Sequence, residues 1–176
     1  MTKSNIYHLM HSPIMTVLSD KDIAESISNG CLGISDFTEK NLTPNGYDVT
    51  ISEIKINGSD EVYREGNVRI PAKTMAFVST RERVRIPDDM CAQLWMRTTW
   101  MRKGLIGVFG KIDAGYEGNL TFGCYNTNDH DVEYPIGERF CQIVFETLSS
   151  ASIKSYEKRS GHYQGSTGIV LDPLKK

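Results

Sequence analysis

The chain is organised around the nine residues GKIDAGYEG, which run from Gly110 to Gly118. Asp113 lies here between apolar Ile112 and glycines that permit a tight turn, and the aromatic Tyr116 follows the bend. Because glycine has no Cβ, its backbone amide can approach a ligand closely, and positive φ costs it little. The segment is therefore predicted to be a hairpin that holds a ligand, although Asp-x-Gly sequences also form ordinary turns in β proteins.

Length and charge limit the classes of protein that are possible. The 176 residues suit one domain with its own core. The net charge of −2 at pH 7 gives no general attraction to nucleic acid or to an anionic membrane, so neither is an expected partner. No apolar run approaches the roughly 18 residues of a membrane span, and residues 1–14 lack the apolar core of a signal peptide. We therefore expect a cytoplasmic protein.

The cysteines and histidines do not indicate a metal site. The four cysteines are far apart and form no Cys-x-x-Cys pair, so we expect reduced and mostly buried thiols. The four histidines show no His-Glu-x-x-His pattern and do not cluster with the cysteines. Residues 129–131, Asp-His-Asp, are expected to be a polar loop, because a metal would need more ligands.

The ends of the chain differ in composition from its middle. Residues 1–14 are polar and aperiodic, and we expect a flexible leader before a β domain at residues 15–157. Residues 158–176 interleave glycines with polar side chains and have too few apolar residues to hold themselves in a core, so a mobile tail is expected. Ser19 and Asp22 form a capping box, which predicts one short helix at about residues 20–29.

After this helix the residue pattern is typical of a β protein. Short runs with period-two alternation or β-branched residues are separated by Gly, Pro, Asn and Asp, which indicates an antiparallel sandwich or barrel. Residues 81–85 are expected to be a solvated strand edge, and Trp95 and Trp100 are expected to be core or subunit-contact residues. The predicted strands are residues 47–56, 76–80, 92–97, 105–109, 119–125 and 140–147.

Five short polar or glycine-rich segments, here called islands, lie between the predicted strands, at their ends or in the tail. Arg97 and Arg102 flank two adjacent hydroxyl residues, a combination that suits phosphate oxygens. The glycine amides and hydroxyls near the C-terminus suit the same chemistry. Each island also has an ordinary explanation, since arginines pair with surface carboxylates and glycines make plain turns. The islands are residues 44–48, 97–102, the Asp113 turn, 137–142 and 165–168.

In order and spacing these islands resemble the trimeric dUTPase and dCTP deaminase superfamily, from residue 15 to residue 168. Residues 16–23, 85–89 and 161–165 are similar to the deaminase branch, and the turn at residues 112–118 is shared by both branches. The resemblance implies an all-β fold, a distorted jelly-roll-like β-barrel of the dUTPase-like β-clip type with a short N-terminal helix. It also implies a homotrimer with sites between subunits.

The resemblance further implies a site for a deoxynucleoside triphosphate. Asp113 would be the general base that activates a water for attack on the α-phosphorus of dUTP, while Mg²⁺ screens the phosphates. Tyr116 would pack under the deoxyribose, and Asp48 would lie near magnesium-bound waters. The tail would close over the nucleotide, with Gln164 reading the base edge. Nucleotide contacts are implied for Arg97, Thr98, Thr99, Arg102, Gly110, Ile112, Tyr116, Gln142, Arg159, Tyr163, Gln164, Ser166 and Thr167.

One position departs from the deaminase pattern. Deaminases of this branch carry a proton-transferring glutamate on the strand after the turn, where this chain has Gly123. We therefore predict a dUTP diphosphatase that forms dUMP and pyrophosphate with Mg²⁺. Two alternatives stay open: a dCTP deaminase, or bifunctional dCTP deaminase/dUTPase, and a non-catalytic deoxynucleotide-binding regulator. Gln142 also has an alternative as a buried amide, because it alternates onto the face of Phe140 and Val144.

Overall fold

The computed structural model describes residues 16–174. The predicted leader at residues 1–14 lies outside the described residues. The helices are α1 (Asp20–Ser28), α2 (Thr98–Met101) and α3 (Tyr156–Arg159), with a 3-10 turn at Glu39–Asn41. The strands are β1 (Gly33–Ile34), β2 (Leu42–Thr43), β3 (Gly46–Ile56), β4 (Val62–Tyr63), β5 (Asn67–Ile70), β6 (Met75–Arg85), β7 (Met90–Met96), β8 (Leu105–Val108), β9 (Lys111–Ile112), β10 (Glu117–Asn126), β11 (Val132–Pro135) and β12 (Arg139–Thr147).

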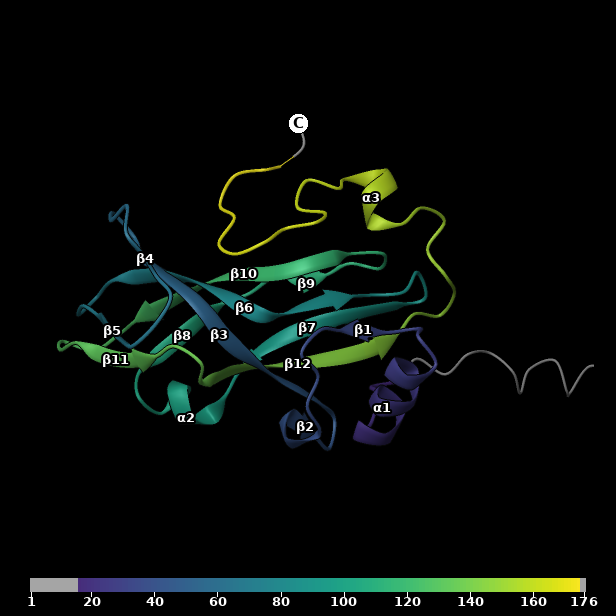
Figure 1. The fold of residues 1–176 in the computed structure, drawn as a ribbon, viewed down its shortest axis with the longest axis horizontal. Helices are drawn as coiled ribbons and strands as arrows, with labels where there is room; N and C mark the ends of the chain where they lie inside the picture. The colour runs from purple at the N-terminus through teal and green to yellow at the C-terminus, as the bar shows by residue number, and fades with distance from the viewer. Residues whose placement is uncertain (1–15, 175–176) are drawn as a thin grey trace, which may run out of the picture.

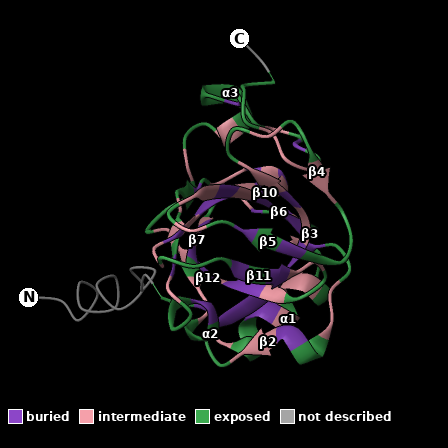
Figure 2. Cartoon of the chain, turned by 90° about the vertical axis from the view of Figure 1, so that its left-hand side faces the viewer, coloured by how far each residue is buried: buried purple, intermediate pink, exposed green. Residues whose placement is uncertain are grey.

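Antiparallel strands form a large sheet that curls on itself, and a smaller sheet. The 10-stranded sheet has the order β8-β10-β6-β3-β12-β7-β9, with β1 beside β6 and with β2 and β4 beside β3. β11 and β5 form the second sheet. Figure 1 shows the C-terminal tail and α3 lying over β10, and Figure 2 shows the buried residues gathered between the strands. The prediction of an all-β, distorted barrel with a short N-terminal helix is confirmed.

The structure contains the predicted helix and strands, with small differences in length. α1 begins after Ser19, whose side chain accepts a hydrogen bond from the backbone N–H of Asp22, and the capping box is complete. Each predicted strand is present, and the small sheet of β5 and β11 was not predicted. The interpretation of residues 81–85 as a solvated edge is wrong. They continue β6, which β1 and β10 both pair, and the side chain of Glu82 is only 2% exposed.

Aromatic side chains dominate one part of the core. Phe140 stacks on Phe122 with ring centroids 5.3 Å apart, and Tyr134 packs edge-on against Phe140 at 4.9 Å. The ring centroids of Trp100 and Tyr134 are 4.0 Å apart, and Trp100 is buried, which confirms it as a core residue. Trp95, by contrast, is 57% exposed. Because Trp100 also donates its indole N–H to the carbonyl oxygen of residue 139, at 2.9 Å, this core fixes α2 against β12.

A β-bulge joins this core to the candidate site. The register between β10 and β6 shifts between Asn119 and Thr121. The side-chain amide of Asn119 donates to the carbonyl oxygens of residues 80, 81 and 82, at 3.0 to 3.2 Å. The backbone N–H of Asn119 faces the other edge of β10, where it donates to the carbonyl oxygen of Ser166 in the tail at 2.9 Å. β8 pairs with residues 123–126 of β10, so the tail can pair with residues 117–119 on the same edge.

Candidate active site

The turn between β9 and β10 carries Asp113 and is fixed by backbone bonds. The N–H of Tyr116 donates to the carbonyl oxygen of Asp113 at 3.1 Å. Ile86 holds the turn from one side, since it accepts from the N–H of Gly115 at 3.1 Å and donates to the carbonyl oxygen of Tyr116 at 2.9 Å. Gly115 has a φ of +81°, and a Cβ there would lie 2.5 Å from the Cβ of Ser155, so only glycine fits.

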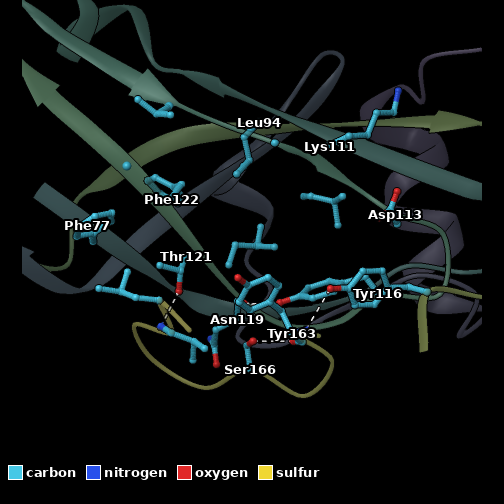
Figure 3. Close-up of a pocket in the computed structure, with 18 residues that line it drawn as sticks. Phe77, Leu94, Lys111, Asp113, Tyr116, Asn119, Thr121, Phe122, Tyr163 and Ser166 are labelled. Carbon is cyan, nitrogen blue, oxygen red and sulfur yellow. Dashed lines mark hydrogen bonds between the residues drawn. The ribbon is translucent and has the colours of Figure 1, made fainter. Parts of the chain in front are cut away.

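A cavity of about 410 Å³ lies between this turn, β10 and the tail (Figure 3). Figure 3 shows Asp113 toward one end of the cavity and Phe77 toward the other. The walls are mostly apolar with a few polar groups, which is the usual make-up of a small-molecule site. Its lining consists of Phe77, Leu94, Val108, Gly110, Lys111, Ile112, Asp113, Tyr116, Asn119, Leu120, Thr121, Phe122, Gly123, Tyr156, Tyr163, Ser166, Val170 and Leu171.

Tyr116 forms a rigid part of the cavity wall. Its side chain is only 7% exposed, and its hydroxyl donates to the carbonyl oxygen of Asn119 at 2.6 Å. The ring of Tyr156 packs against it edge-on, with centroids 5.5 Å apart. Burial raises the pKa of Tyr116 to about 12, so the hydroxyl stays protonated and keeps donating at neutral pH. The ring therefore has one fixed orientation, as a surface under a sugar requires.

The tail forms another wall. The backbone N–H of Gly165 donates a hydrogen bond to the carbonyl oxygen of Glu117 at 2.8 Å. The backbone N–H of Asn119 donates to the carbonyl oxygen of Ser166 at 2.9 Å. Farther on, the hydroxyl of Thr121 donates to the carbonyl oxygen of Gly168 at 3.2 Å and accepts from the N–H of Val170 at 3.1 Å. The tail thus closes the cavity within the same chain, while its mobility stays a prediction.

A second hollow of about 470 Å³ adjoins the first at Asp113, Lys111 and Tyr156. Its lining also includes Lys154 and Arg159, so three cationic side chains gather there. Lys111 is held by Glu146, with Nζ and Oε2 2.9 Å apart, and this hydrogen bond raises the pKa of Lys111. Asp113 therefore stands between a mostly apolar cavity and a basic hollow.

Several predicted site residues lie elsewhere in the chain. Arg97 and Gln142 do not line the cavity, nor do the exposed Thr98, Thr99 and Arg102 of the α2 segment. Gln142 donates its amide to the hydroxyl of Thr43. Of the predicted tail residues, Tyr163 and Ser166 line the cavity, Arg159 lines the second hollow and Thr167 is exposed. One chain thus brings together only part of the predicted site.

Asp48, the predicted neighbour of a magnesium ion, is engaged by arginines. Its Oδ2 lies 2.8 Å from Nε of Arg97 and 3.4 Å from Nη1 of Arg139. Its side chain is 6% exposed, and burial raises its pKa more than the two guanidinium groups lower it. A carboxylate already paired with two guanidinium groups does not suit direct ligation of Mg²⁺, and the described residues contain no group of three or more potential metal ligands. The water-mediated role stays a prediction.

Gly123 lies on the cavity wall, where deaminases of this branch would carry glutamate. A Cβ at this position would lie 3.2 Å from Sδ of Met75 and 3.2 Å from Cβ of Val108. These side chains occupy the place of the missing one. Among the described residues that line the cavity, Asp113 is the one carboxylate.

The sequence did not single out several lining residues. Asn119 and Thr121 alternate with buried Leu120 and Phe122 along β10, so a period-two pattern could have placed them on the cavity face. Val170 of the tail carried no comparable signal, because its position depends on the fold of the tail over β10. None of the helices in the described part of the chain is both long and apolar enough to cross a membrane.

The raised pKa of Tyr116 leads to a prediction. Replacing Tyr116 with phenylalanine removes the bond to Asn119 and should lower the free energy of unfolding by about 1 kcal/mol at pH 7. The pKa of Tyr116 is higher in the folded protein than in the unfolded chain. Its contribution to the free energy of unfolding is therefore complete below pH 10 and is lost as the pH rises toward 12. Absorbance titration of phenolate formation should show one late-titrating tyrosine fewer in Tyr116→Phe. An unchanged titration curve would contradict the assignment.

Comparisons with known proteins agree on the family. A family model described as dCTP deaminase-like matches residues 56–148. The dCTP deaminase of Pyrococcus horikoshii is 41% identical over 145 residues, which cover 81% of this chain and 91% of that protein. The protein of Methanosphaera stadtmanae named dCTP deaminase, dUMP-forming, is 31% identical over 188 residues, covering 92% of this chain and 95% of the relative.

Solved structures support the fold. The crystal structure of 2'-deoxycytidine 5'-triphosphate deaminase from Agrobacterium tumefaciens matches with a TM-score of 0.65 at 18% identity, over 76% of this chain and 49% of that one. A mutant dUTPase of phage phi11 of S. aureus, described as coordinating a structural Mg(II) ion, matches with a TM-score of 0.50 at 20% identity, over 73% of this chain and 98% of that chain.

The prediction of a plain dUTP diphosphatase is contradicted by these relatives, since those at 31 to 41% identity are named dCTP deaminases. It rested on Gly123 alone, and the absence of a carboxylate from one strand position does not exclude proton transfer by another group in the same cavity. The chain belongs to the dCTP deaminase-like family.

Proposed function

We propose that the protein deaminates dCTP in the cavity beside Asp113. The observation that carries this proposal is a cavity in which Asp113 is the one carboxylate among the described lining residues, in a chain 41% identical to a protein named dCTP deaminase. A cavity of about 410 Å³ is of the size that takes a small ligand. The apolar end suits a pyrimidine ring and a deoxyribose, and Tyr116 is the surface on which the sugar packs.

The reaction requires water to add at C4 of the cytosine ring and ammonia to leave. Asp113 accepts a proton from the attacking water and returns a proton to the departing amino group, so that dCTP and water give dUTP and ammonia. No other described residue that lines the cavity carries a carboxylate, and Gly123 has no side chain to transfer a proton. The mostly apolar walls and the tail exclude bulk water from the ring.

The phosphates belong on the other side of Asp113. Lys111, Lys154 and Arg159 line the adjoining hollow, and their charges suit a triphosphate. Mg²⁺ enters this scheme as part of the substrate, bound to the phosphates, because the chain presents no ligand cluster of its own among the described residues. A cytoplasmic location fits such a substrate and stays a prediction.

A second candidate is a reaction that continues to dUMP. Its support is the Methanosphaera stadtmanae relative, which is named as dUMP-forming and aligns over 92% of this chain. Asp113 lies at the boundary between the cavity and the basic hollow, where a water positioned by its carboxylate would also face the α-phosphorus. Because C4 lies opposite N1, which carries the sugar and phosphates, dUTP would have to shift within the site before the same carboxylate could serve the second step.

The complete site is proposed to require a second copy of the chain. Thr98, Thr99 and Arg102 are exposed and lie outside their own chain's cavity. Exposed apolar side chains lie on the neighbouring segments: Trp95, Met101, Ile106 and Val108 are all more than half exposed. A homotrimer would cover these side chains and supply the α2 segment to the cavity of a neighbour.

Product analysis tests the proposed activity. The protein is incubated with dCTP and Mg²⁺, and nucleotides and ammonia are quantified. Ammonia should appear in equal amount with dUTP, or with dUMP and pyrophosphate if the second reaction follows. Asp113→Asn should lower turnover by at least about 100-fold, as loss of a general acid–base does, whereas Asp129→Asn, in an exposed loop, should not. Untouched dCTP beside hydrolysed dUTP would contradict the proposal.

Hybrid trimers test the shared site. Asp113→Asn and Arg102→Ala chains should each be nearly inactive, but trimers assembled from an equal mixture should recover up to about a quarter of the wild-type activity, because a quarter of the interfaces pair two intact residues. Mass spectrometry verifies the mixed composition. Verified hybrids without recovered activity would show that Asp113 and Arg102 act within one chain.

A further inference from the structure

Gln164 lies at the point where the tail meets the Asp113 turn. Its Oε1 accepts a hydrogen bond from the backbone N–H of Glu117 at 3.1 Å, and its Nε2 donates to the carbonyl oxygen of Gly115 at 3.2 Å. These two backbone groups flank Tyr116 in the sequence. Both ends of the carboxamide are therefore engaged by the turn itself.

The same side chain is absent from the cavity lining among the described residues, although its neighbours Tyr163 and Ser166 are present there. The two backbone bonds fix the orientation of the carboxamide, and the N–H and lone pair that they leave over belong to a side chain that does not line the cavity. The resemblance had assigned base reading to Gln164. The contacts within this chain point to a different task.

We infer that Gln164 is a positioning residue that clasps the turn and holds Tyr116 in place, and that it does not read the base. The inference rests on the proposed nucleotide site. Ile86 holds the turn from one side through Gly115 and Tyr116, and Gln164 holds it from the other. The backbone on both sides of Tyr116 is thus held by the closed tail.

The backbone around the clasp supports this arrangement. The tail pairs with β10 immediately beside Gln164, through the Gly165 bond to Glu117 and the Asn119 bond to Ser166. This close approach needs Gly118, where a Cβ would lie 3.0 Å from the backbone nitrogen and 3.2 Å from the backbone oxygen of Ser166. The clasp and the pairing therefore form one unit, which opens and closes together.

Substitutions at Gln164 separate clasping from base reading. Gln164→Ala removes both bonds. Gln164→Glu keeps the acceptor for Glu117 but loses the donor to Gly115, placing a carboxylate against a carbonyl oxygen. A base reader changed to glutamate would alter the preference between dCTP and dUTP, because cytosine offers an amino donor where uracil offers an acceptor. If Gln164 only holds the turn, the same substitution would weaken the binding of dCTP and of dUTP by the same factor.

The experiment is hydrogen exchange without nucleotide, followed by binding of dCTP and dUTP. In Gln164→Ala the amides of Glu117 and Gly165 should exchange about tenfold faster or more, as loss of two hydrogen bonds implies, while the Ile86 amide should not change. Both Gln164 variants should bind dCTP and dUTP more weakly by the same factor. Asp172→Asn, at an exposed position in the same tail, is the control and should resemble the wild type in every measurement.

The inference is overturned if Gln164→Glu changes the ratio of dCTP to dUTP affinity, or if the Glu117 amide keeps its protection in Gln164→Ala. Exchange is measured on the free protein. A failure of the wild type to bind dCTP would therefore count against the proposed function, and the exchange result would still decide the clasp.

Discussion

Backbone pairing between the tail and the first residues of β10 is the constraint on which the site depends. Residues 117–119 of β10 extend beyond β8 and pair with Gly165 and Ser166, and Gly118 lets the two backbones approach. Without this pairing the cavity would lose one wall, and Tyr116 would lose the support of Gln164. The proposed ligand site therefore depends on the local strand geometry of β10, and closure of the tail over a bound ligand would limit the access of water to it.

Electrostatics divide the polar groups of the chain into two sets. Asp113 is exposed at the boundary of the cavity and a basic hollow, so it can meet water and substrate. Asp48 is buried and held by two arginines, which suits a structural role in fixing Arg97. The proposed chemistry is thus concentrated on one carboxylate. A second subunit is the proposed source of the arginine and hydroxyl groups that one chain leaves outside its cavity.

The sequence predicted the elements whose signals are local. The capping box at Ser19 marked α1, and the glycines around Asp113 marked the turn, because both depend on neighbouring residues. It did not predict that residues 81–85 continue β6 between β1 and β10, because these pairings join segments that are far apart in the sequence. It likewise did not reveal the clasp at Gln164, since both bonds join residues more than 40 positions apart. The dUTPase prediction failed because it gave Gly123 more weight than the segments at residues 16–23, 85–89 and 161–165 that resemble the deaminase branch.

A crystal structure of the inactive Asp113→Asn variant with dCTP and Mg²⁺ would test the account most directly. The account predicts the cytosine ring in the cavity, with C4 facing residue 113, the sugar on Tyr116 and the tail of the same chain closed over β10. The phosphates should extend toward Lys111 and Arg159. A cytosine ring bound elsewhere, or with C4 directed away from residue 113, would contradict the proposal that Asp113 carries the deamination.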